Sequence, residues 1–199
     1  GHQWKSGHTF NQCASDSQFN FESACEPGSG STIMSYSGSC GTNNISTANT
    51  ALYYHACSIA EIRRFVEFQE GSTCGTTLAT NNTAPTVSTA YPPVTFIPIS
   101  TPFELTGSAT DMEGDALTYS WDEIDLGPTS PLGSPSGSAP LFRWFEPTTS
   151  PSRTFPRIQT VILNSNNITE VLPTYSRDIT FVLVARDNVA GGGGVAWDT

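Results

Sequence analysis

The chain has 199 residues, with 8 basic and 18 acidic side chains and a formal net charge of −10. This length suffices for one large or two small domains, each burying its own core. Basic residues form no cluster along the sequence, which argues against nucleic acid as a partner, because phosphate binding needs a patch of Lys and Arg. No apolar run approaches the roughly 20 residues of a membrane-spanning helix.

The cysteines all lie in the first 74 residues. Together with the scarcity of Lys and the abundance of Ser, Thr and Asn, this predicts a secreted, extracellular or cell-surface protein whose N-terminal part is held by disulfides. An odd number leaves one thiol free or paired to another segment, and the connectivity stays open. The disulfide candidates are Cys13, Cys25, Cys40, Cys57 and Cys74, and three sequons mark Asn44, Asn81 and Asn167 as glycosylation candidates in exposed loops.

Residues 1–71 are predicted to form one loop-rich unit that ends in a single helix. Apolar residues recur at steps of three and four between positions 51 and 69, which is one face of a helix. These residues are Leu52, Ala56, Ile59, Ile62 and Val66. His55 lies off this stripe and is expected on the surface.

After a Ser/Thr/Asn-rich linker at 72–90, the pattern changes to short alternating runs separated by Pro, Gly and Asp. About seven strands without an intervening helix are typical of an immunoglobulin-like β-sandwich, here spanning 91–199. The predicted strands are 94–99, 103–109, 116–123, 141–145, 159–163, 179–185 and 194–197. Residues 127–140 are predicted to be a loop with little to bury.

Three acidic residues at alternate positions, Asp111, Glu113 and Asp115, precede the third predicted strand. Their oxygens are candidate calcium ligands, with Asp187 and Asn188 as possible partners. The alternative is a solvated acidic turn in which Gly114 adopts a positive φ.

Two histidines six residues apart, His2 and His8, are followed by Ser31-Thr32-Ile33-Met34-Ser35-Tyr36. This arrangement resembles the downstream half of a metzincin zinc site, His-Glu-x-x-His-x-x-Gly-x-x-His, and its Met-turn. With the intervening Glu26-Pro27-Gly28-Ser29-Gly30 and the helix, the order is similar to that of secreted bacterial reprolysin-like metallopeptidases, in which β-sandwich modules follow the catalytic domain. Residues 111–121 resemble part of a cadherin-like or PKD module.

The resemblance implies that His2 and His8 are zinc ligands, that Met34 packs beneath the metal, and that Tyr36 stabilises the transition state. The first His and the catalytic Glu of the pattern would precede Gly1, so the chain by itself lacks the general base. Lys5 replaces the Gly of the pattern and must either adopt a backbone conformation costly for a residue with a Cβ or change the turn.

The sequence therefore predicts an α+β protein, with a metzincin-like C-terminal subdomain followed by an immunoglobulin-like sandwich. One hypothesis is a portion of a secreted zinc endopeptidase that acts on protein or peptide substrates, active only if an upstream His-Glu segment completes the site. The alternative is a non-catalytic extracellular structural protein that forms filaments by strand exchange or head-to-tail contacts. An adhesion or carbohydrate-binding module ranks last, because no aromatic platform is evident.

Overall fold

The computed structural model describes residues 1–13, 16–45 and 51–199 and combines one main helix with antiparallel sheets and two disulfides. The helices are α1 (Ala56–Phe68), α2 (Ile158–Ile162) and the 3-10 helices η1 (His2–Trp4), η2 (Asp16–Gln18), η3 (Gly41–Asn43) and η4 (Glu70–Thr73). The strands are β1 (Thr86–Ser88), β2 (Phe103–Thr106), β3 (Ser108–Thr110), β4 (Thr118–Glu123), β5 (Ser152–Phe155), β6 (Phe181–Arg186) and β7 (Val195–Asp198). No helix in the described part of the chain is long and apolar enough to cross a membrane.

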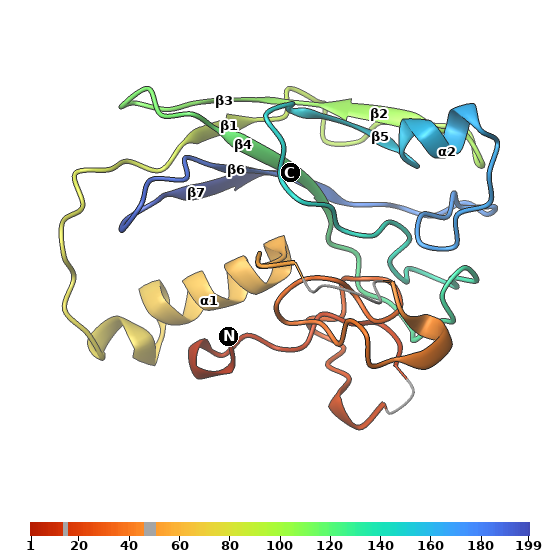
Figure 1. Ribbon diagram of the computed structural model, residues 1–199, viewed down its shortest axis with the longest axis horizontal. Helices are drawn as coiled ribbons and strands as arrows, with labels where there is room; N and C mark the ends of the chain where they lie inside the picture. The colour runs from red at the N-terminus through yellow and green to blue at the C-terminus, as the bar shows by residue number, and fades with distance from the viewer. Residues whose placement is uncertain (14–15, 46–50) are drawn as a thin grey trace.

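The elements form three layers (Figure 1). The middle layer is the sheet β4-β6-β7, with β6 paired to both neighbours. The pairs β1-β3 and β2-β5 lie on one face of this sheet, and α1 lies on the other.

The central strand β6 is apolar on both faces because both faces are covered. Leu183 and Phe181 point into a core shared with Trp121 and Phe155, whereas Val182 and Val184 point into a second core under α1. This alternation follows from the period of two along a strand. Tyr119 and Trp121 of β4 and Phe181 and Leu183 of β6 thus belong to one core.

The N-terminal 45 residues contain little regular structure, and polar contacts attach them to the β layers. The Asn11 side-chain oxygen accepts the Ser130 N–H at 2.9 Å, and the Asn43 side-chain oxygen accepts the Leu132 N–H at 3.1 Å. Residues 127–140 form a loop, as expected. This loop is also the surface that the N-terminal segment contacts.

Helix α1 begins five residues later than the apolar periodicity predicts. His55 is its N-cap, and the His55 Nδ1 accepts the Cys57 N–H at 3.3 Å. Leu52, counted on the apolar face, is exposed. The prediction that His55 lies on the surface is wrong: its residual exposure is 2%, because the ring caps the helix and packs against the sulfur of Cys25.

Several predicted strands differ from the structure. The run 103–109 is split at Gly107, where pairing changes from β5 to β1. Residues 94–99 form no strand: prolines at 93 and 98 remove backbone donors, and Phe96 is 92% exposed. Residues 141–145 contain only an isolated bridge at Phe142.

The segment 159–163 was predicted to be a strand and instead overlaps α2, a short helix directly after Pro156 and Arg157. Its β-branched residues favour strands, but it has no sheet neighbour, so the local turn prevails. Strand β5 was missed because its four polar and aromatic residues lack a clear alternation, and β1 lies inside the predicted linker 72–90.

Candidate functional site

The two predicted zinc ligands lie side by side. The Nε2 atoms of His2 and His8 are 3.0 Å apart, and the rings meet edge to face. The chain reverses between them at Lys5, whose φ of 62° and ψ of 14° are left-handed. Lys5 thus adopts the costly conformation that the sequence predicted for the residue in place of Gly.

Backbone carbonyls determine which ring nitrogen carries the proton in both histidines. The Nδ1 of His2 lies 2.9 Å from the Ser6 carbonyl oxygen, and the Nδ1 of His8 lies 2.9 Å from that of Gln18. A carbonyl only accepts, so each Nδ1 is the donor, and each Nε2 of the neutral ring presents a lone pair. The two Nε2 atoms therefore face each other across 3.0 Å, close enough for one cation to contact both.

The Met-turn lies directly against the segment 2–8 that joins the two histidines, which we call the histidine loop. The Thr9 N–H donates to the Met34 carbonyl at 3.1 Å, and the Met34 side chain is buried. A Cβ on Gly1 would lie 2.0 Å from the Met34 sulfur, so the thioether packs tightly beneath the start of η1. The Tyr36 ring contacts His8 with centroids 4.7 Å apart and stacks on Phe10.

A buried carboxylate connects the segment after His8 to the segment before Met34. Glu26 is 1% exposed and accepts hydrogen bonds from the Thr9 hydroxyl at 2.5 Å and the Thr32 hydroxyl at 2.6 Å. It also accepts the Ser31 N–H at 2.9 Å. Charge-assisted bonds of this kind orient both segments at once.

A second carboxylate holds the histidine loop from outside. Glu61 on α1 accepts the Gly7 N–H at 2.9 Å and the Ser6 hydroxyl at 3.1 Å, and it also accepts the Ser23 hydroxyl. Ser6 is the residue whose carbonyl orients His2. Neither Glu26 nor Glu61 received a role in the sequence analysis. The sequence offers only weak signals for these two roles. Glu26 is an acid in a turn rich in Gly and Ser, and Glu61 is an acid on the polar face of the predicted helix.

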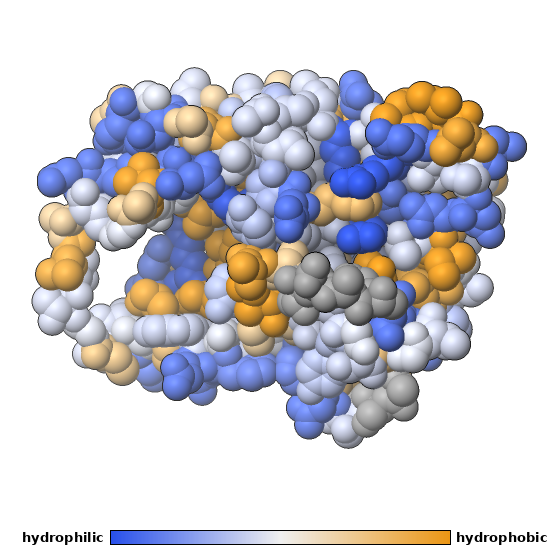
Figure 2. Space-filling view, viewed as in Figure 1, coloured by the Kyte–Doolittle hydropathy of each residue, from blue (hydrophilic) through white to orange (hydrophobic). Residues whose placement is uncertain are grey.

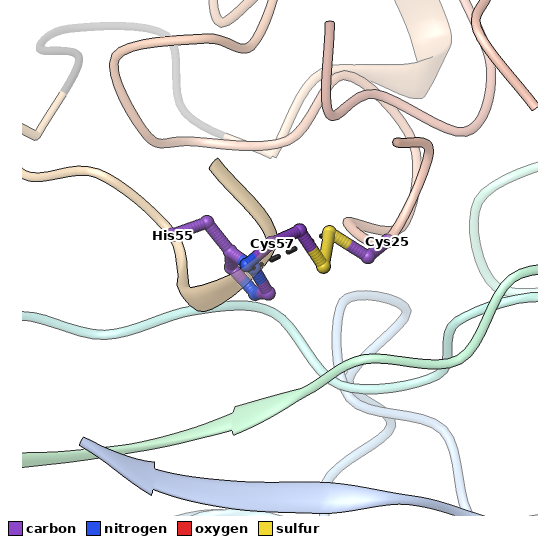
Figure 3. A group of neighbouring side chains, drawn as sticks. All are labelled: Cys25, His55 and Cys57. Atoms are coloured by element: carbon purple, nitrogen blue, oxygen red, sulfur yellow. Dashed lines mark hydrogen bonds between the residues drawn. A yellow bond between two sulfur atoms is a disulfide. The ribbon is translucent and has the colours of Figure 1, made fainter. Parts of the chain in front are cut away.

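The third histidine belongs to a separate group with Cys25 and Cys57 (Figure 3). Its Nδ1 lies 3.3 Å from the Cys25 sulfur. The two sulfurs are joined in a disulfide, so neither is a thiolate, and the Nδ1 lone pair already accepts a backbone N–H. These three residues do not fit a zinc ion.

The disulfide prediction is confirmed for four of the five cysteines. Cys13 pairs with Cys40, and Cys25 pairs with Cys57, while Cys74 is a free, exposed thiol.

Among the sequons, Asn81 is exposed, whereas the Asn167 side chain is hydrogen-bonded to Thr169 and Glu170. Asn44 bonds to Cys40 and Gly41, and the hydroxyl residue of its sequon, Ser46, lies outside the described residues.

The predicted calcium ligands Asp111, Glu113 and Asp115 also come together, with ligand oxygens within 4.8 Å of one another. The Asp111 carboxylate accepts the backbone N–H of Glu113 at 3.0 Å and of Asp115 at 2.9 Å, and Gly114 has the positive φ expected of the turn. Partial desolvation and the charge of Asp111, with smaller contributions from Asp187 and Glu113, raise the pKa of Asp115.

Comparison of the chain with protein-family models, curated protein sequences and solved structures finds no match.

Proposed function

We propose that residues 1–71 form part of a zinc-dependent peptidase site of the metzincin type, with His2 and His8 as two of its ligands. One observation carries this proposal: both imidazoles place Nδ1 at 2.9 Å from a backbone carbonyl oxygen and bring their Nε2 atoms to 3.0 Å from each other. Zinc-binding histidines have this outer hydrogen bond, which sets the tautomer and the ring orientation.

The spacing also suits the metal. Two nitrogens on one tetrahedral zinc, each at 2.0–2.1 Å, are about 3.3 Å apart, close to the 3.0 Å between the two Nε2 atoms. Bound zinc would supply a Lewis acid and an activated water. The chain's own contribution is positional: Met34 supports the loop from below, Glu26 and Glu61 hold its two sides, and Tyr36 packs along His8.

The proposal extends to the rest of the chain. A secreted enzyme would retain the Cys13–Cys40 and Cys25–Cys57 disulfides. The β layers would be an accessory module of the immunoglobulin-like type. The substrate class that the metzincin resemblance implies is protein or peptide, and His2 is exposed at the surface.

Zinc titration of the chain by calorimetry tests the ligand assignment. His2→Ala and His8→Ala are each expected to weaken zinc binding at least about tenfold, since each removes a direct ligand. Gln3→Ala is the matched control: it changes an exposed residue of η1 and keeps both imidazoles. Equal zinc affinity in the unaltered chain and in His8→Ala would refute the proposal.

The catalytic part is tested on the protein isolated from its natural source. Its N-terminal sequence is expected to contain a His four residues before His2 and a Glu three residues before it. Peptide cleavage that is abolished by a chelator and restored by zinc would support a peptidase. A mature protein without that Glu would leave a metal-binding structural role.

A further inference from the structure

Three of the eight basic residues of the chain gather around one aromatic ring. The guanidinium carbons of Arg143, Arg153 and Arg157 lie 4.6, 4.8 and 3.4 Å from the centroid of Phe145. These arginines follow one another at steps of ten and four residues, and the fold brings them together around Phe145. Guanidinium groups stack on aromatic faces while their edges remain free to bind oxyanions.

Among the described residues, Arg153 is the only one of these three arginines that forms an ion pair. Arg153 forms an ion pair with the buried Glu170 at 3.0 Å. In residues 1–13, 16–45 and 51–199, Arg143 and Arg157 take part in no ion pair, and the Arg157 guanidinium donates no hydrogen bond. Desolvation, followed by repulsion from Arg157, lowers the pKa of Arg143. An incoming carboxylate would relieve this repulsion.

Arg157 is the N-cap of α2, and Arg143 shares the Phe145 ring with it, so exposed apolar side chains of α2 and its C-cap follow directly in the chain. Ile162 and Leu163 are each 73% exposed, and Ile158 is also exposed. Figure 2 shows hydrophobic surface at the end of the molecule that carries α2. We call the surface formed by Arg143, Arg157, Ile158, Ile162 and Leu163 the arginine end.

The opposite end of the long axis has the complementary composition. The loop between β3 and β4 lies at the left of Figure 1 and α2 at the right. This loop carries Asp111, Glu113 and Asp115, with Met112 82% exposed among them, and we call these four residues the acidic tip. Within the described residues, no arginine or lysine pairs with the acidic tip, and the Asp115 carboxylate accepts no hydrogen bond.

We propose that the acidic tip of one copy of this chain binds the arginine end of the next copy. Each surface holds unpaired charges of one sign together with exposed apolar groups, so the contact would neutralise both charge sets and cover Met112, Ile162 and Leu163. The two surfaces differ and lie at opposite ends of the molecule. The contact is therefore heterologous and generates an open, head-to-tail filament.

Sedimentation velocity across increasing protein concentration, with EDTA present, tests the contact. We expect concentration-dependent growth at about 0.1 M salt and its loss at about 0.5 M, where the Debye length falls from about 10 Å to about 4 Å. Arg157→Glu and Asp115→Lys are each expected to lower the apparent association constant at least about tenfold, because like charges would then face each other. Arg64→Glu, which changes an exposed arginine of α1, is the control and should associate like the unaltered chain.

A mixing experiment makes the test specific. In a mixture of the two variants, the lysine introduced by Asp115→Lys in the tip of one chain faces the glutamate introduced by Arg157→Glu in the arginine end of the other chain. The acidic tip of the Arg157→Glu chain in turn faces the unaltered arginine end of the Asp115→Lys chain. An equimolar mixture of the two variants is therefore expected to assemble into alternating filaments, although each variant alone stays monomeric. A mixture that stays monomeric, or an unaltered chain that stays monomeric at both salt concentrations, would overturn the proposal.

The outcome of these self-association experiments does not depend on zinc binding at the histidine loop. EDTA removes divalent metals, and neither variant changes the histidine loop. If filaments are absent but zinc affinity depends on His8, only the self-association proposal fails. If filaments form without any zinc affinity, only the peptidase proposal fails.

Discussion

The residues that form the histidine site are held by acceptors from three different parts of the chain. Main-chain carbonyls of Ser6 and Gln18 orient the two rings, Glu26 joins the following segment to the Met-turn, and Glu61 reaches across from α1. Glu61 touches neither Nε2 atom, so it is a positioning residue.

Replacing Glu61 by Gln is expected to weaken zinc binding about tenfold. The Gly7 N–H and the Ser6 hydroxyl would lose a charged acceptor, and the carbonyl that orients His2 would be less well fixed. Calorimetric zinc titration measures the effect, with metal-free thermal unfolding recorded in parallel. Glu67→Gln, which alters an exposed acid paired with Arg63 on the same helix, is the control. A fall in melting temperature without any change in zinc affinity would show that Glu61 is merely structural.

At the scale of elements, close approach between the layers explains why one predicted strand is divided in two. Gly107 separates β2 from β3, and a Cβ there would lie 2.3 Å from the Leu183 Cδ2 and 3.1 Å from the Ser88 carbonyl oxygen. Gly107→Ala is therefore expected to lower the free energy of unfolding by about 1–3 kcal/mol through overpacking. Urea denaturation measures the loss. Gly75→Ala, where an added Cβ meets nothing within 4 Å, should show almost none.

The end of β4 carries a buried acid that makes stability depend on pH. Burial, together with the neighbouring Asp125, raises the pKa of Glu123 from 4.5 to about 8, although the backbone N–H groups of Leu141 and Phe142 and the charge of Arg177 oppose the shift.

Between pH 4.5 and about 8, the folded protein therefore holds a proton that the unfolded chain has released. The contribution of Glu123 to stability is complete below pH 4.5 and is lost as the pH rises through about 8. Urea unfolding across this range is expected to show the stability of the unaltered chain falling relative to that of Glu123→Gln. A difference that stays constant with pH would contradict the assignment.

At the scale of the whole molecule, the N-terminal segment and the β layers share an interface. The Ala56 N–H at the start of α1 donates to the buried Asp122 of β4 at 3.0 Å, and α1 packs on Val182 and Val184. The Cys25–Cys57 disulfide fastens the loops of the histidine site to the first turn of this helix.

Removing that disulfide by Cys25→Ala with Cys57→Ala is expected to cost about 2–4 kcal/mol, because a loop of 32 residues is no longer closed in the unfolded chain. Thermal and urea unfolding under oxidising conditions measure the loss. Cys74→Ala removes only the free, exposed thiol and should change stability by less than about 0.5 kcal/mol. An equal effect of both changes would mean that this disulfide does not stabilise the fold.

The sequence by itself determined the features that depend on local pattern. Periodicity located the main helix and the strands β4 and β6, and the resemblance to a metzincin site implied that His2, His8 and Met34 lie close together. Composition predicted the disulfides, although not their pairing. Periodicity is a local signal, because backbone geometry alone relates side chains that are a few residues apart.

Only the tertiary structure decided the features that depend on residues distant in sequence. His55 is buried against the Cys25–Cys57 disulfide, whose cysteines are 32 residues apart, and Arg143, Arg153 and Arg157 meet only around the Phe145 ring. Glu61 reached the histidine loop across more than fifty residues. The free energy of such contacts comes from desolvation and packing between separate segments, and no local pattern in the sequence records which segments meet.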